Sequence, residues 1–234
     1  MSTAAIKTAV ISQPHCCPWM GYMKLIAMSD VFVILDNVQF EKRSWQNRNR
    51  IKGPNGPVFL TVPVVTRGRY EQKISEVEID NTQPWGKKHL KTIELNYRRA
   101  PHYDAIMNEI GPLLEKQWGF LMEFTISVIR TLSGLLRFEP DFHFASNIAA
   151  PGGKNEYLIN ICKQFDATRY ISNDGSAAYL DDALFSAAAV KLEFLNYKHP
   201  EYEQLFGEFV PYMSCLDVLM NTGPERAREL VLTG

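Results

Sequence analysis

The stretch TAVISQPHCCPWMGYMKLIAMSDVFVILD, residues 8–36, decides the fold of this chain. Its first five residues form an apolar run typical of a short buried strand, and VFVILD, residues 31–36, is a second apolar run bounded by charge. Between the two runs, Met23, Ile26 and Ala27 recur at helical spacing and predict a helix over residues 21–29. A strand, a turn, a helix and a second strand in this order predict a βαβ unit with two parallel strands.

Parallel strands joined in this way bind ligands in the crevice at their carboxyl ends. The turn at residues 13–19, which holds prolines at 14 and 18, follows the first strand directly. Asp36 and Asn37 end the second strand. We therefore expect the turn and the residues after Asp36 to lie together at the ligand-binding edge.

Farther along the chain, helical and strand-like patterns alternate. A Gly-Pro-Asn-Gly-Pro cluster at residues 53–57 predicts a tight connection, and Pro63 in the following run VFLTVPVV indicates an edge position or the end of a strand. Helical patterns occupy residues 83–97 and 101–136, the latter with a break at Gly111 and Pro112. The last third of the chain predicts strands at residues 169–172 and 190–196 and helices at residues 155–165, 179–188 and 215–220. We expect one α/β domain over residues 1–234, with a mostly parallel sheet, flanking helices and a helical insertion at roughly residues 83–150.

Composition excludes several classes of protein. Of the 234 residues, 46% are hydrophobic and 22% are charged, which is typical of a folded globular chain, and the net charge of −1 does not favour nucleic acid as a partner. The N-terminal residues 1–12 do not read as a secretory signal, and we expect no membrane span and a cytoplasmic location. The four cysteines are expected to be reduced thiols, and no metal-ligand spacing is present.

A polar, basic segment covers residues 42–50. It holds four cations and three amides, and in an extended conformation Ser44, Gln46, Arg48 and Arg50 would share one face while Arg43, Trp45, Asn47 and Asn49 would share the other. A guanidinium group binds phosphate oxygens through two parallel hydrogen bonds, so one of these faces could hold a diphosphate. The alternative is a solvated basic edge strand, although such an edge requires neither the amides nor a tryptophan.

Three residues are candidates for acid–base chemistry. His15 lies in the first turn and could accept a proton from an attacking amine, while Asp36 could act as a general base or could instead pair with an arginine. His199 follows a predicted strand in the segment Tyr-Lys-His-Pro, where a structural role is the alternative. Whether the thiols of Cys16 or Cys17 take part as acyl acceptors stays open. Residues 172–176 could direct backbone amides towards an anion at the start of the next helix, a weak signal.

The run QPHCCPWMGYMKLIAMSDVFVILDNVQFEKRSWQNRNRIKGPNG, residues 13–56, resembles the opening of the WbqC-like family. The likeness includes Gln-Pro, Pro-Trp, Gly-Tyr, the aspartate-bearing strand and Lys-Arg-Ser-Trp-Gln-Asn-Arg, and weaker echoes extend it over the chain. Cys16 departs from the pattern, which often has an aromatic residue there. The resemblance and the spacing together give this set of expected substrate-binding residues: Gln13, Trp19, Tyr22, Asn37, Lys42, Arg43, Ser44, Trp45, Gln46, Asn47, Arg48 and Arg50.

The resemblance implies a transferase of O-antigen or decorated-sugar synthesis that adds an acyl or aminoacyl group to a nucleotide-linked amino sugar. The donor would be a thioester of coenzyme A or of an acyl carrier protein. One alternative is an ATP- or CTP-dependent nucleotidyltransferase or amide ligase, since the layout of residues 13–36 is similar by spacing to such folds, although Tyr22 follows Gly21 where they carry histidine. The other alternative is a non-catalytic partner protein in a sugar-modification complex.

Overall fold

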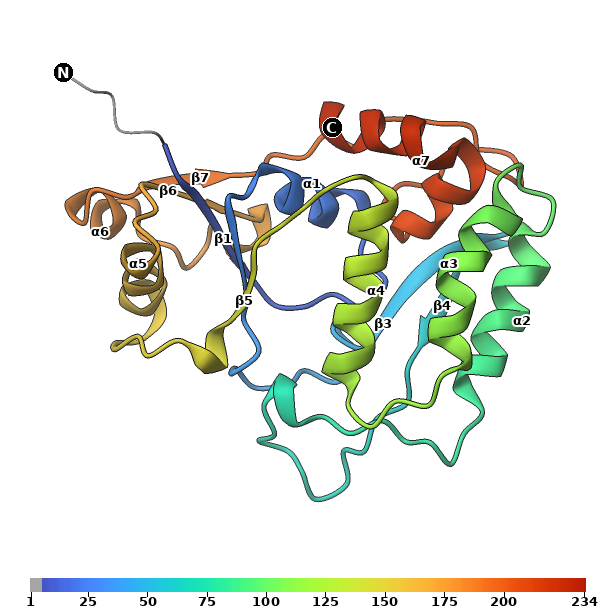
Figure 1. The fold of residues 1–234 in the computed structure, drawn as a ribbon, viewed down its shortest axis with the longest axis horizontal. Helices are drawn as coiled ribbons and strands as arrows, with labels where there is room; N and C mark the ends of the chain where they lie inside the picture. Colours follow the sequence, from blue (N-terminus) through green and yellow to red (C-terminus); the bar gives the residue numbers. More distant parts are fainter. Residues whose placement is uncertain (1–5) are drawn as a thin grey trace.

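A five-stranded parallel sheet lies at the centre of the computed structural model, which describes residues 6–234 (Figure 1). The strand order is β5-β2-β1-β6-β7, and every neighbouring pair is parallel. The strands are β1 (Thr8–Ser12), β2 (Val31–Ile34), β5 (Phe142–Phe144), β6 (Arg169–Ser172) and β7 (Lys191–Phe194). The predicted α/β fold with a parallel sheet is therefore confirmed. Residues 1–5, part of the stretch expected to lack a secretory signal, lie outside the described residues.

Helices bury both faces of the sheet. Along β1, Val10 packs into one core with Phe32, whereas Ala9 and Ile11 pack into a second core on the other face, because successive side chains of a strand point to opposite sides. The first core contains α1 (Met20–Met28) and α4 (Leu121–Leu135), and the second contains α5 (Lys154–Gln164) and α6 (Asp182–Ala187). Burial on both sides explains why β1 and β2 are nearly continuous apolar runs rather than alternating ones.

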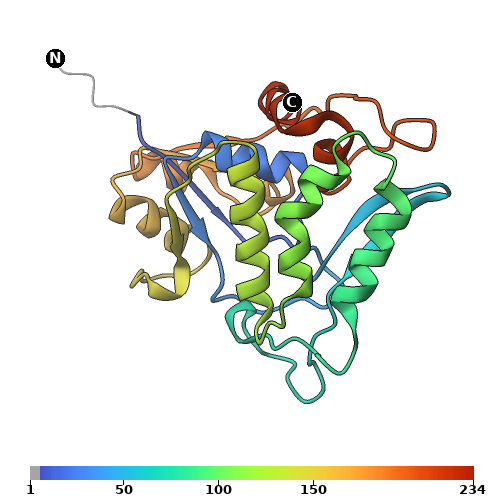
Figure 2. The same cartoon turned by 45° about the vertical axis from the view of Figure 1, so that its right-hand side comes forward.

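A large segment is inserted between β2 and β5. It begins with an antiparallel hairpin of β3 (Arg48–Gly53) and β4 (Gly56–Thr61) and continues through α2 (Trp85–Tyr97), α3 (Tyr103–Glu115) and α4. The three helices pack side by side, as Figures 1 and 2 both show. The C-terminal helix α7 (Cys215–Thr233), kinked at Gly223 with φ 78°, packs against α1 and α3.

Four details differ from the sequence-based expectation. Residues 42–47 form turns rather than an extended strand, so only residues 48–50 of the basic segment alternate along β3. β5 lies inside the range expected to be helical, because it is only three residues long and completes the sheet beside β2. α3 continues through Gly111 and Pro112, since burial of Ile110 and Leu114 stabilises its last turn. α7 extends well beyond the predicted residue 220.

The remaining expectations concern the membrane and the thiols. Among residues 6–234, no helix combines the length and the apolar character needed to cross a membrane. All four cysteines are buried and unpaired.

Candidate functional site

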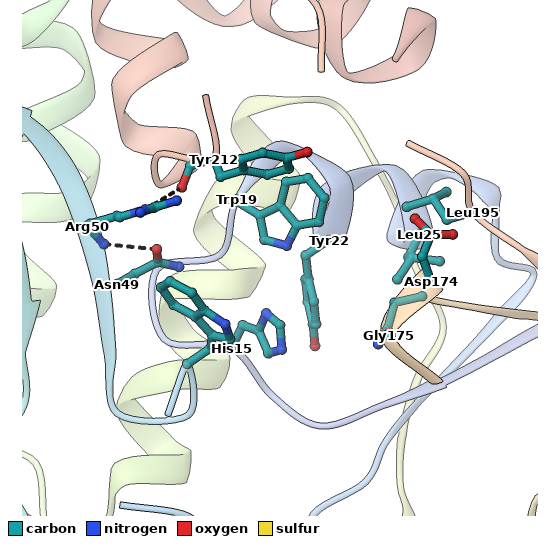
Figure 3. A pocket seen from close by; sticks show the side chains of 12 residues that line it. His15, Trp19, Tyr22, Leu25, Asn49, Arg50, Asp174, Gly175, Leu195 and Tyr212 are labelled. Carbon is teal, nitrogen blue, oxygen red and sulfur yellow. Dashed lines mark hydrogen bonds between the residues drawn. The ribbon is translucent and has the colours of Figure 1, made fainter. Parts of the chain in front are cut away.

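The sheet has a switch point between β1 and β6. The chain leaves β1 towards β2 on one side and later returns through β6 on the other side, so the connections that follow these two neighbouring strands diverge. Such a divergence leaves a crevice at the carboxyl ends of the strands. A cavity of about 450 Å³ opens there (Figure 3), within the range of small-molecule sites. It is lined by His15, Trp19, Tyr22, Leu25, Trp45, Asn49, Arg50, Asn173, Asp174, Gly175, Leu195 and Tyr212.

Aromatic rings form much of the cavity wall. The Trp19 indole, just before α1, lies 5.4 Å from the Tyr212 ring between centroids. The chain can bring this indole down onto α1 because residue 21 is glycine: a Cβ at Gly21 would lie 2.2 Å from an indole carbon. Trp45, 43% exposed, supplies a further aromatic surface. The Pro-Trp-Met-Gly-Tyr segment thus places one indole at the cavity by a local steric arrangement.

His15 and Tyr22 stack on one another at this wall. Their ring centroids are 4.8 Å apart with an interplanar angle of 26°. Burial lowers the pKa of His15 to about 4 and raises the pKa of Tyr22, so both side chains are uncharged at neutral pH. The His15 Nδ1 atom is buried and has no hydrogen-bond partner within residues 6–234. His15 therefore lines the cavity as a neutral imidazole and is a weak base.

Arg50 brings a positive charge to the cavity from β3. Its Nε donates to the Tyr212 carbonyl at 3.1 Å, and its guanidinium lies 5.7 Å from the centre of the Trp45 ring. The backbone amide of Arg50 donates to the Asn49 Oδ1 at 2.9 Å, which leaves the buried Asn49 Nδ2 without a partner among the described residues. The other guanidinium donors of Arg50 have no hydrogen-bond partner among residues 6–234 and can bind an anion.

The structure does not bring the other cations of residues 42–50 to this cavity. Lys42 donates to the Thr66 hydroxyl at 3.3 Å, and the Arg48 guanidinium lies 4.6 Å from the centre of the Phe59 ring. Arg43 is exposed in a turn, with a φ of 64°. The extended conformation expected over residues 42–50 begins only at Arg48, so Ser44 and Gln46, which lie in the turn at residues 42–47, do not continue the face of Arg48 and Arg50.

The amides of the same segment hold the turn in place. The Gln46 Nε2 donates to the Gln13 Oε1 at 2.9 Å, which ties the hairpin to the first turn after β1. The Asn47 Nδ2 donates to the Val62 carbonyl at 3.0 Å. The Ser44 hydroxyl donates to the Glu41 carbonyl at 2.7 Å. These residues position the walls of the cavity rather than line it.

Asp36 and Asn37 lie at a different part of the sheet edge, next to β5. The Asp36 carboxylate accepts hydrogen bonds from the Ser146 amide at 2.8 Å and from the Ser146 hydroxyl at 2.6 Å, so its partner is a serine and not the arginine that was considered. The Asn37 Nδ2 donates to the Tyr157 hydroxyl at 2.7 Å. Asn37 borders a separate cavity of about 560 Å³ and Asp36 lines neither.

His199 lies behind the aromatic wall and does not line the cavity. Its ring is 6.4 Å from Trp19 and 5.5 Å from Tyr212 between centroids, and burial lowers its pKa. It supports these rings from the irregular segment 195–213, which we call the strap. Strap residues Tyr202 and Gln204 donate to the buried Asp217 carboxylate at 2.8 and 2.9 Å.

Sequence reasoning missed several residues of the cavity. Tyr212 and Leu195 belong to the strap, which carries no regular pattern. Asp174 lies in the 172–176 segment that was assigned a role through its backbone amides, yet its side chain is what lines the cavity. Its position after a strand, like that of Gln13 after β1, is the signal that could have found it.

The surroundings of the cysteines and of the possible metal ligands do not favour thiolate or metal chemistry among residues 6–234. The neighbouring Cys17 and burial raise the pKa of Cys16 well above its usual range, so Cys16 is a neutral thiol rather than a thiolate. Within residues 6–234, no three side chains of His, Cys, Asp or Glu gather in a metal-binding arrangement.

Comparison with known proteins finds similarity along most of the chain. The chain is 36% identical over 222 residues to the uncharacterized protein Rv1507c of Mycobacterium tuberculosis (strain ATCC 25618 / H37Rv), and the match covers 94% of this chain and 96% of the relative. No solved structure matches it. The profile of the WbqC-like protein family matches residues 13–229. The chain therefore belongs to the WbqC-like protein family.

Proposed function

We propose that this protein is a transferase of sugar biosynthesis that binds a nucleotide-linked amino sugar in the cavity at the β1–β6 switch point and adds an acyl or aminoacyl group to it. Membership of the WbqC-like family suggests a role in polysaccharide or sugar-related biosynthesis. The observation that carries the finer proposal is the combination of an aromatic wall with the free guanidinium of Arg50 in one cavity.

The two kinds of group match the two parts of a nucleotide. Aromatic side chains stack on nucleobases, with about 1–3 kcal/mol for each base, and Trp19, Trp45 and Tyr212 offer such faces. A guanidinium binds phosphate oxygens through parallel hydrogen bonds, and Arg50 lies beside Trp45 and Tyr212. The diphosphate would therefore bind next to the base, with the sugar directed farther into the cavity.

His15 takes a revised role in this proposal. With a pKa of about 4, its imidazole lines the cavity in the neutral form, which orients a substrate group more readily than it removes a proton. Neither Asp36 nor His199 is given a catalytic role, because Asp36 is engaged by Ser146 and His199 supports the aromatic wall. The donor is proposed to be a thioester of coenzyme A or of an acyl carrier protein. The ammonium form of the sugar loses a proton to solvent, the neutral amine forms an amide bond with the acyl carbon, the carbon–sulfur bond breaks, and the thiol leaves with the second proton of the nitrogen.

The alternatives receive less support from the cavity. An ATP- or CTP-dependent nucleotidyltransferase or ligase stabilises a transferring phosphoryl group with several cations, and among the described residues Arg50 is the one cation that lines this cavity. A non-catalytic partner protein does not require a cavity that combines an aromatic wall with the guanidinium of Arg50.

A pair of arginine variants tests the proposal. Calorimetric titration of UDP-glucosamine and of a dTDP-linked 4-amino sugar, each with and without magnesium, measures affinity for the wild type, Arg50→Ala and Arg48→Ala. Arg48 is the matched control, since it lies on the same strand and also packs on an aromatic ring but does not line the cavity.

We expect Arg50→Ala to weaken binding by about 1.5–3 kcal/mol, the value of a hydrogen bond to a charged group, and Arg48→Ala to leave it unchanged. Turnover with an acyl thioester should then occur only with a nucleotide sugar that binds. Binding of ATP or CTP with magnesium in place of the nucleotide sugars would overturn the proposal in favour of nucleotidyl transfer. Binding of neither class would favour a partner protein.

A further inference from the structure

Two opposite charges without ionic partners line the same cavity. Arg50 comes from β3 and Asp174 from the residues that follow β6, and Figure 3 shows them on opposite sides of Trp19 and Tyr22. Within residues 6–234, neither side chain forms an ion pair with any group. The cavity therefore has a positive part and a negative part, which suits a ligand with an anionic end and a cationic end.

Asp174 is held in place through one of its oxygens. Its Oδ1 accepts a hydrogen bond from the Asn196 backbone amide at 2.8 Å, which ties the β6 end to the residues after β7. Its Oδ2 accepts no hydrogen bond from the described residues and is free for a ligand. Asp174 is exposed, and Leu25 and Leu195 lie beside it in the cavity wall (Figure 3).

The other polar groups of the cavity do not oppose a cation there. His15 carries no charge at neutral pH because burial lowers its pKa to about 4. Asn173, next to Asp174, adds a neutral amide, and Arg50 lies across the cavity. Among the described residues, Asp174 is the one acidic side chain that lines this cavity.

We infer that Asp174 binds the protonated amine of the sugar and selects the free amino sugar over its N-acylated form. This inference rests on the proposed function and deepens it, since it states which form of the sugar the cavity takes. An acetamide at the same carbon carries no charge and is bulkier, so it cannot form the charged hydrogen bond with the Asp174 carboxylate. The same difference would favour release of an acylated product.

Three matched ligands in each of two series test the inference. The UDP series is UDP-glucosamine, UDP-N-acetylglucosamine and UDP-glucose, which place an amine, an acetamide and a hydroxyl on the same carbon. The dTDP series places the same three groups at carbon 4 of one dTDP-linked sugar. Affinities are measured by calorimetry at neutral pH for the wild type, Asp174→Asn and Asp182→Asn.

The two aspartate variants are matched. The Asp174→Asn substitution keeps the shape of the side chain and an acceptor oxygen for the Asn196 amide, while it removes the charge. Asp182, in α6, is also an exposed carboxylate, and it does not line the cavity. Its replacement controls for the change in net charge.

We expect the wild type to bind the amine about tenfold more tightly than the acetamide or the hydroxyl in the series that fits, the effect of one charge-assisted hydrogen bond. Asp174→Asn should abolish this preference, and Asp182→Asn should retain it. Equal affinities for all three ligands in the wild type, or a preference that survives in Asp174→Asn, would overturn the inference and leave the proposed function standing. Failure of every ligand in both series to bind would instead overturn the proposed function, and the inference with it.

Discussion

Replacement of Asp217 by alanine should release the strap that closes one side of the cavity. The Asp217 carboxylate is 0% exposed and accepts hydrogen bonds from Tyr97 on α2 and from Tyr202 and Gln204 of the strap. The Gln204 side chain in turn bonds both backbone groups of Val210, close to the cavity residue Tyr212. One carboxylate therefore joins α7, α2 and the strap.

The cost of this substitution can be estimated from the groups that lose a partner. A buried donor left without an acceptor costs about 1–3 kcal/mol, and removal of one member of a buried charged network costs about 3–5 kcal/mol. Alanine leaves the hydroxyl donors of Tyr97 and Tyr202 without acceptors and removes one of the hydrogen bonds of Gln204, so we expect a loss of about 4 kcal/mol in the free energy of unfolding. For a chain of this size, such a loss lowers the melting temperature by roughly 8–16 °C.

Urea unfolding followed by circular dichroism measures this loss, with unchanged slope as the sign that the transition is still two-state. Asp217→Asn keeps one acceptor oxygen and should cost about 1–2 kcal/mol, since one donor is still left unpaired. Asp182→Ala, at an exposed site, is the control and should stay within about 0.5 kcal/mol of the wild type. An Asp217→Ala variant that unfolds within about 1 kcal/mol of the wild type would refute the role of this network in holding the strap.

Other perturbations address the wall and the buried histidines. Gly21→Ala should displace the Trp19 indole, lower the free energy of unfolding by about 1–3 kcal/mol and weaken nucleotide-sugar binding in calorimetry. The control is Gly134→Ala in α4, where a Cβ meets no atom within 4 Å and the substitution should be neutral or slightly stabilising. Equal effects of the two substitutions would contradict the steric argument. Trp19→Ala should lower the free energy of unfolding in urea by about 3 kcal/mol and also reduce affinity for the nucleotide sugar, because the indole packs on Tyr197 and lines the cavity. A variant with wild-type stability and lost affinity would show that Trp19 is a ligand contact alone. Burial lowers the pKa of His89 from 6.5 to about 4, so the unfolded chain binds more protons between these pH values and the free energy of unfolding should fall by about 3 kcal/mol as the pH drops through that window. In unfolding experiments at about pH 7 and about pH 4.5, His89→Gln should show a smaller fall than the wild type. Equal falls in the two proteins would show that His89 is not buried in its neutral form.

The sequence by itself determined the central architecture. Apolar runs at residues 8–12 and 31–34, joined by a helical pattern, were enough to predict a parallel sheet, because strands buried on both faces leave a nearly unbroken apolar signal in the sequence. The turn after the first strand was also identified as a ligand-binding position, and His15, Trp19 and Tyr22 do line the cavity.

Only the tertiary structure decided which polar residues gather at the cavity. A sequence pattern reports neighbours along one strand or helix, whereas Arg50, Asp174 and Tyr212 come from a hairpin, a strand end and an irregular strap that meet only after the sheet has closed. The basic segment shows the limit most clearly: Ser44 and Gln46 would continue the face of Arg48 and Arg50 only if the backbone were extended, whereas the hydrogen bonds of Gln46 with Gln13 and of Asn47 with Val62, formed with distant parts of the chain, fix a turn there instead. The distances between such residues depend on tertiary packing, which the periodicity of a single strand or helix does not contain. For this reason the sequence predicted which edge of the sheet holds the cavity, whereas only the tertiary structure determined which residues line it.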